Sequence, residues 1–98
     1  MEAPIFLGDE VSAAGYRLAG ARVRVPAPGE EAGCLQWARR EADLVLISAE
    51  CAARIPAVLM RQAVAAPLPL VLVVPDVLGR AEPPDLAARL LMQLGIAE

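Results

Sequence analysis

Four short apolar runs, each followed by a helix-like segment, restrict the fold of this 98-residue chain more than any other feature. The runs cover residues 3–8, 21–25, 43–48 and 68–74. Strands that alternate with helices of this length are typical of a parallel sheet joined by right-handed crossovers. Because the mass is only 10.3 kDa, we expect a single domain over residues 1–98.

The composition of the runs predicts the order of the strands. Residues 3–8, 43–48 and 68–74 are continuously apolar, as expected for strands that are covered on both faces. Residues 21–25 alternate Arg with Val, which is typical of an edge strand with one face in water. We therefore expect an α/β fold, a small three-layer sandwich with a four-stranded parallel sheet in the order 2-1-3-4, as in flavodoxin and receiver domains.

Helix boundaries follow from capping residues. The first helix is predicted from the cap Asp9 to about Leu18, with Gly20 closing it. The side chains that share its apolar face, which we expect to meet the sheet, are Val11, Ala14, Gly15 and Leu18. Gly15 lies within the helix, where we expect it to permit close packing on the sheet.

The later helices are predicted in the same way. Glu30 and Glu31 begin the second helix, which ends near Arg40. Residues 49–66 form a helical stretch that Pro56 interrupts, so that the main helix begins at about Ile55. A last helix is predicted over about 84–95. The predicted core comprises Ile5, Leu7, Leu18, Val23, Leu44, Leu46, Ile55, Leu59, Val71 and Val73.

The composition excludes several kinds of chemistry. The chain contains no His, which removes the usual general base and the commonest metal ligand, and all nine of its cationic residues are Arg. Without Lys it has neither a phosphate-binding loop of the usual type nor a Schiff base. The net charge of −3, with no basic patch, argues against nucleic acid as a partner. No cofactor and no metal site are predicted.

Two acids directly follow the first strand, where open parallel sheets bind ligands. Asp9 and Glu10 could hold a divalent cation, as in receiver domains, but that interpretation also needs an acceptor Asp where this chain has Ser48, and a Lys. The alternative is that Asp9 caps a helix and Glu10 favours its positive end. Gly8, Gly15 and Gly20 do not form a dinucleotide-binding motif.

The two cysteines are interpreted as reduced thiols in a cytoplasmic protein. Cys34 and Cys51 lack the close spacing of a redox or metal motif. Cys51 lies near a helix start, which can activate a thiol, or it is a small buried side chain. No apolar run approaches the roughly 20 residues of a membrane helix, so we expect membrane association only through a partner.

Candidate partner contacts lie on three helices. Trp37, at the margin of the apolar face of the second helix, is either half buried in the core or a partner contact. The same two interpretations apply to Tyr16 and Arg17 on the first helix. On the last helix, Leu86, Leu90 and Leu94 form one stripe, which is either a core face or one that also meets a partner. The side chains beyond this stripe, which we expect to contact a partner, are Arg89, Leu91, Met92 and Ile96.

Residues 6–20, Phe-Leu-Gly-Asp-Glu-Val-Ser-Ala-Ala-Gly-Tyr-Arg-Leu-Ala-Gly, resemble the opening of the F subunit of V-type and A-type rotary ATPases (ATP synthases). In that family a strand is followed by Gly-Asp, Ala-Gly, an aromatic residue and Arg-Leu-Ala-Gly. Looser similarities extend the resemblance over nearly the whole chain: residues 43–48, Ile55-Pro56, residues 67–72 and Leu94-Gly95-Ile96.

The resemblance implies a non-catalytic subunit of the central stalk. Such a subunit binds the coiled-coil D subunit of the stalk, rotates beneath or within the catalytic A/B hexamer, and couples ATP hydrolysis or synthesis to proton or sodium transport. It would be cytoplasmic and attached to the membrane through the complex. The resemblance also implies a regulatory role through a movable carboxyl-terminal helix. The loop at 76–84 is short and ends in Pro83-Pro84, which argues against a long swinging tail. The alternative function is a degenerate receiver-like interaction module without phosphoryl transfer.

Overall fold

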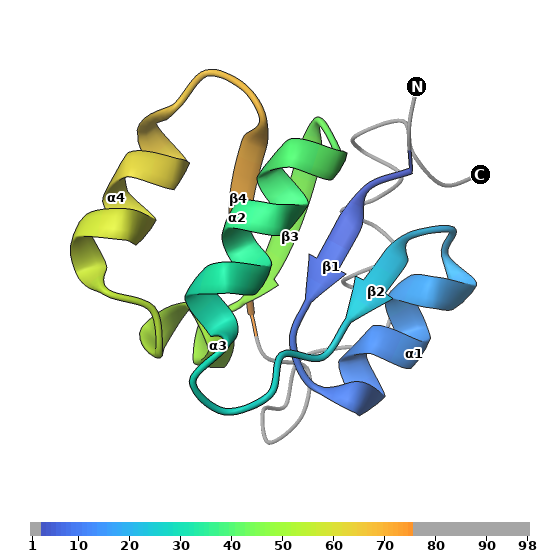
Figure 1. Ribbon diagram of the computed structural model, residues 1–98. Helices are drawn as coiled ribbons and strands as arrows, with labels where there is room; N and C mark the ends of the chain where they lie inside the picture. The colour runs from blue at the N-terminus through green and yellow to red at the C-terminus, as the bar shows by residue number, and fades with distance from the viewer. Residues whose placement is uncertain (1–2, 76–98) are drawn as a thin grey trace.

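The computed structural model describes residues 3–75, which form a parallel sheet in the order β2-β1-β3-β4 (Figure 1). The α/β fold and the strand order predicted from the sequence are confirmed. The predicted helix at 84–95 lies outside the described residues. The elements in chain order are β1 (Ile5–Leu7), α1 (Glu10–Leu18), β2 (Arg22–Arg24), α2 (Glu31–Glu41), β3 (Leu44–Ser48), α3 (Ala49–Ala53), α4 (Ala57–Ala65) and β4 (Leu70–Val74).

Local signals place the helix boundaries close to their predicted positions. Gly20, with a φ of +102°, ends α1 in the left-handed region that favours glycine. The backbone N–H of Gly20 donates to Arg17 O and that of Ala21 to Tyr16 O, each at 3.0 Å. Pro56 separates α3 from α4 as predicted, because its ring prevents a continuous helix.

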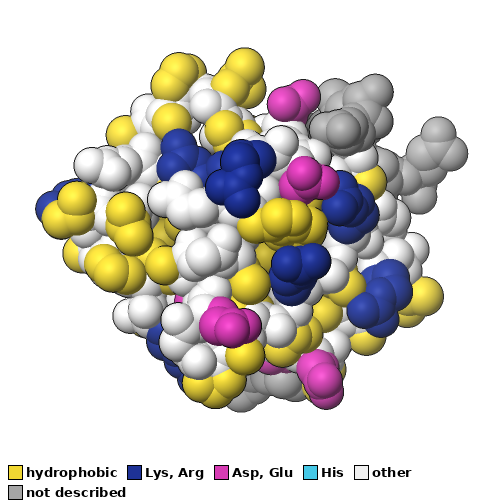
Figure 2. Space-filling model, viewed as in Figure 1, with side chains coloured by type: hydrophobic (Ala, Val, Ile, Leu, Met, Phe, Trp, Pro, Cys, Tyr) yellow, Lys and Arg dark blue, Asp and Glu magenta, His cyan; other side chains and the backbone are white. Residues whose placement is uncertain are grey.

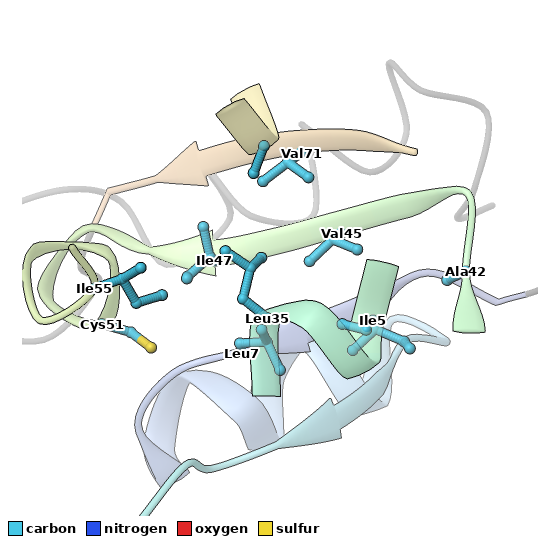
Figure 3. Packing of buried hydrophobic residues seen from close by; sticks show 11 residues of the cluster. Ile5, Leu7, Leu35, Ala42, Val45, Ile47, Cys51, Ile55 and Val71 are labelled. Atoms are coloured by element: carbon cyan, nitrogen blue, oxygen red, sulfur yellow. The ribbon is translucent and has the colours of Figure 1, made fainter. Parts of the chain in front are cut away.

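Helices cover both faces of the sheet and give two apolar clusters. On one face, α2, α3 and α4 pack on residues of β1, β3 and β4, and Figure 3 shows these side chains converging between sheet and helices. On the other face, α1 packs on the remaining strand positions. The first cluster is centred on Ile5, Leu7, Leu35, Val45, Ile47, Ile55 and Val71, and the second on Phe6, Ala13, Tyr16, Leu46 and Val74.

The predicted buried face of α1 is wrong. Leu18 is 91% exposed and Val11 is exposed as well, whereas Ser12, Ala13 and Tyr16 face the sheet. The reason is an aromatic contact: the Tyr16 ring stacks on Phe6 of β1, with centroids 4.2 Å apart and planes at 12°. Burial of this large ring and its stacking on Phe6 stabilise the observed orientation of α1.

Two other expectations are corrected. Gly15 does not serve close packing on the sheet, because nothing lies within 4 Å of the position that a Cβ would occupy. Val73 is 46% exposed and Leu70 is also exposed, although Val71 and Val74 of the same strand are buried. β4 lies at an edge of the described sheet, where cover by the helices is incomplete. Val23, Leu44 and Leu59 are half buried, and the other predicted core residues are buried: Ile5, Leu7, Leu46, Ile55 and Val71.

Candidate functional site

A cleft of about 290 Å³ lies at the carboxyl edge of the sheet, between the connections that leave β1 and β3. These connections diverge, one toward β2 and the other toward β4, and such a point is where open α/β sheets bind ligands. The charged side chains that line the cleft are Asp9, Glu10, Glu31, Glu50 and Arg54.

Asp9 and Ser48, the two positions that a receiver domain would use, both cap helices. The Asp9 carboxylate accepts a hydrogen bond from the Ser12 backbone N–H at 2.9 Å, and the Ser48 hydroxyl accepts one from the Cys51 backbone N–H at 3.1 Å. The capping interpretation of Asp9 is therefore confirmed. Within residues 3–75, no group of three or more Asp, Glu, Cys or His side chains could hold a metal ion.

The most buried carboxylate of the cleft belongs to Glu31, which is 5% exposed. One oxygen accepts a hydrogen bond from the Gly29 backbone N–H at 3.0 Å, and the other lies 3.9 Å from Arg54 Nη1. Arg54 also pairs with Glu50 at 2.7 Å. These contacts connect the start of α2 to the end of α3, so Glu31 has a structural role in positioning the two helices.

Cys51 lines the same cleft but is not activated. Burial, followed by the negative charge of Glu31, raises the pKa of the Cys51 thiol to about 11. A thiol with such a pKa is almost entirely protonated at neutral pH and is a poor nucleophile. Both cysteines are free, and the interpretation of Cys51 as a small buried side chain is confirmed.

The sequence-predicted contacts Tyr16, Arg17 and Trp37 do not come together. Tyr16 is 2% exposed beneath α1, and burial raises the pKa of its hydroxyl. Arg17 is exposed on the same helix. Trp37 belongs to α2, on the opposite face of the sheet. The other predicted contacts, Arg89, Leu91, Met92 and Ile96, lie outside the described residues.

Trp37 is half buried and already has a cationic neighbour. The guanidinium carbon of Arg24 lies 3.8 Å from the Trp37 ring centroid and that of Arg22 lies 5.5 Å away. Arg22 also pairs with Glu41 of α2 at 3.6 Å. The two Arg side chains of the edge strand β2 therefore lie against α2, and charged residues on an edge strand disfavour pairing with another strand.

Sequence reasoning missed an open apolar groove of about 730 Å³ between α3, α4 and β4, which we call the α4 groove. Its lining includes Ala52, Ile55, Met60, Arg61, Val64 and Val73. One signal was available in the sequence. Apart from Arg61 and Gln62, every residue of α4 is apolar, although only Ala63 is buried.

Comparison with protein families identifies the class to which the chain belongs. The family described as ATP synthase (F/14-kDa) subunit matches residues 5–89. A search of curated proteins found no match. None of the helices in residues 3–75 is long and apolar enough to cross a bilayer. Because the family match extends over most of the sequence, the chain belongs to the ATP synthase (F/14-kDa) subunit family, the F subunits of V/A-type enzymes, a family of non-catalytic components of the rotary ATPase complex.

Proposed function

We propose that this chain is a non-catalytic subunit of the central stalk of a V/A-type rotary ATPase. It binds the coiled-coil D subunit of the stalk and rotates with it relative to the catalytic A/B hexamer. In this way it couples ATP hydrolysis or synthesis to proton or sodium transport. The complex acts at the cytoplasmic side of the membrane. The observation that carries the proposal is the family match over residues 5–89.

The chemistry of the cleft supports a binding role over a catalytic one. Asp9 and Ser48 are occupied as helix caps, Glu31 accepts a backbone hydrogen bond, and Cys51 has a raised pKa. None of these side chains is arranged as a nucleophile next to a base, which is the arrangement that group transfer requires. The receiver-like alternative loses its support for the same reason.

The principal contact with the coiled coil is proposed on the predicted last helix. Leu91, Met92 and Ile96 extend beyond the stripe that packing within this domain would use. Met and Leu adapt well to the surface of a partner helix. Arg89 would lie beside acidic groups of the partner, where an exposed pair contributes about 0–1 kcal/mol. We also propose that residues 1–98 form one domain that includes this helix.

The test is the double substitution Leu91→Asp with Met92→Asp. We expect the purified wild-type chain to form a complex with the coiled-coil subunit in size-exclusion chromatography and calorimetry. The double variant should keep its circular dichroism spectrum and lose binding by about tenfold or more, because two charges would be buried in an apolar contact.

Two outcomes contradict different parts of the proposal. If the wild-type chain does not bind the coiled-coil subunit, the stalk function is wrong. If the folded double variant binds as tightly as the wild type, the stalk function stands and the contact must lie elsewhere on the surface.

A further inference from the structure

We propose that the α4 groove is a second docking site, which receives an apolar, carboxylate-bearing face of a helix in the coiled-coil stalk subunit. This inference rests on the proposed function and adds to it a surface within residues 3–75. Three observations carry it: the exposed apolar surface of α4, the geometry of the groove, and the positive charge of Arg61, which forms no ion pair with a carboxylate of residues 3–75.

α4 is too apolar for the position it occupies. A helix that is apolar on all sides is normally buried on all sides. Here Val64 is 50% exposed and Val58 is also exposed, and within the described part of the chain Ala63 is the only buried residue of α4. Nearby on the edge strand β4, Val73 is exposed too. Contiguous exposed apolar surface of this kind marks sites of protein association.

The shape of the groove suits a helix. Ala57, Met60, Arg61, Val64 and Ala65 line one wall, and their spacing along α4 forms the ridge that packs into the grooves of another helix. Small side chains of α3, among them Ala49, Ala52 and Ala53, also line the groove. Such side chains allow a second helix to approach to the separation of about 8–10 Å seen in packed helices.

The charges around the α4 groove indicate the chemistry of the partner that binds there. Among residues 3–75, Arg61 is the only charged side chain that lines the groove, and no carboxylate of this part of the chain forms an ion pair with it. The N-terminus of α4 begins at Pro56 without a side-chain cap and without an acid in its first turn, which leaves partial positive charge at one end of the same wall. The complementary partner is an apolar helix that carries a carboxylate opposite Arg61.

Apolar and charged side chains gather over different elements of the surface. Figure 2 shows apolar side chains gathered over α4, whereas Arg, Asp and Glu gather over β2 and α2. A second copy of the chain fits the groove poorly, because a two-fold contact through α4 would place two Arg61 side chains close together. We therefore assign the groove to the coiled-coil subunit.

The first experiment measures the affinity of the full-length chain for the purified coiled-coil subunit. We expect Arg61→Glu and Val64→Glu each to weaken binding by about tenfold or more. The matched controls, Arg40→Glu on α2 and Val11→Glu on α1, make the same kinds of change at positions outside the groove and should stay within about twofold of the wild type. All variants are compared by thermal denaturation.

The second experiment identifies the occupant. A photoreactive benzoylphenylalanine in place of Val64 should give a covalent adduct with the coiled-coil subunit, and the same group in place of Val11 should not. An adduct between two copies, a crosslink confined to residues 84–95 of the same chain, or no adduct in a complex that has formed would overturn the inference. If the wild type binds and the groove variants bind equally well, the inference is wrong while the proposed function stands. If the wild type does not bind, both are wrong.

Discussion

Asp9 and Ser48 use their side-chain oxygens in the same way, at the two helix starts that follow β1 and β3. Each accepts a hydrogen bond from the backbone N–H three residues later. A cap and a cation ligand both require a polar residue directly after a strand, so the sequence leaves the two roles of Asp9 open. The structure decides between these two roles. The Asp9 carboxylate accepts the hydrogen bond of the Ser12 N–H at the start of α1, and it therefore acts as the helix cap.

This capping role predicts that Asp9 is not a phosphoryl acceptor. Incubation of the purified chain with acetyl phosphate and Mg²⁺ should give no stoichiometric phosphorylation, since residues 3–75 contain no metal-binding cluster and the chain has no Lys to neutralise the transferred group. Intact-mass spectrometry measures the result, with a receiver domain as the positive control. An adduct of one phosphate that disappears in Asp9→Asn would restore the receiver-like function.

At the scale of single elements, we predict opposite effects on stability when the two glycines in and after α1, Gly15 and Gly20, are replaced by alanine. Gly15→Ala should stabilise the chain by up to about 1 kcal/mol, because alanine favours a helix interior and a Cβ there meets no other atom within 4 Å. Gly20→Ala should destabilise it by about 1–3 kcal/mol, because the φ of +102° is unfavourable for residues with a Cβ.

Urea denaturation of both variants against the wild type gives the two free energies of unfolding. Each variant is the control for the other, since the chemical change is identical and the positions are close in sequence. A loss of stability in Gly15→Ala would show that the surroundings of α1 are tighter than the described residues indicate.

Element boundaries could be predicted from the sequence, whereas the orientation of α1 could not. Pro56 and Gly20 act locally, through ring geometry and through access to positive φ, so their effects are visible in the sequence itself. The rotation of α1 about its axis depends on Phe6, which stacks on Tyr16 from another element. Two faces of α1 have helical spacing, one with Val11 and Leu18 and one with Ala13 and Tyr16. The face that contains the aromatic ring packs on the sheet.

At the scale of the whole molecule, the candidate docking surface was only partly predictable. The partner contacts on the last helix came from its excess of apolar residues and lie outside the described residues. The α4 groove was missed because Val73 was assigned to the core. The predicted order 2-1-3-4 already places this strand at an edge, but its continuously apolar composition indicated cover on both faces. Composition does not show which positions of such a strand the helices leave exposed.

Two buried titratable groups predict a loss of stability in alkali. Burial raises the pKa of Cys51 from 9.0 to about 11 and also raises the pKa of Tyr16 above its ordinary value. Both groups therefore hold their protons more firmly in the folded chain. Their contribution to stability is fully present below about pH 9 and decreases as the pH rises toward 11, because the unfolded chain releases these protons first.

Urea midpoints at pH 8 and pH 10.5 measure this effect. We expect a lower midpoint at pH 10.5 and a smaller decrease in Cys51→Ala, which lacks one of the two groups. An unchanged midpoint in the wild type would mean that both groups titrate alike in the folded and unfolded chains.

The strand order also determines when the sheet can form during synthesis. β1 and β2 emerge first, but the centre of the sheet needs β3, and residues 44–48 then pair with β1 along one side while their other side waits for β4. Until residues 70–74 have left the ribosome, this apolar strand has an unpaired edge that can capture other nascent chains. The interval between β3 and β4 is therefore the stage of synthesis at which this strand edge is open to other chains.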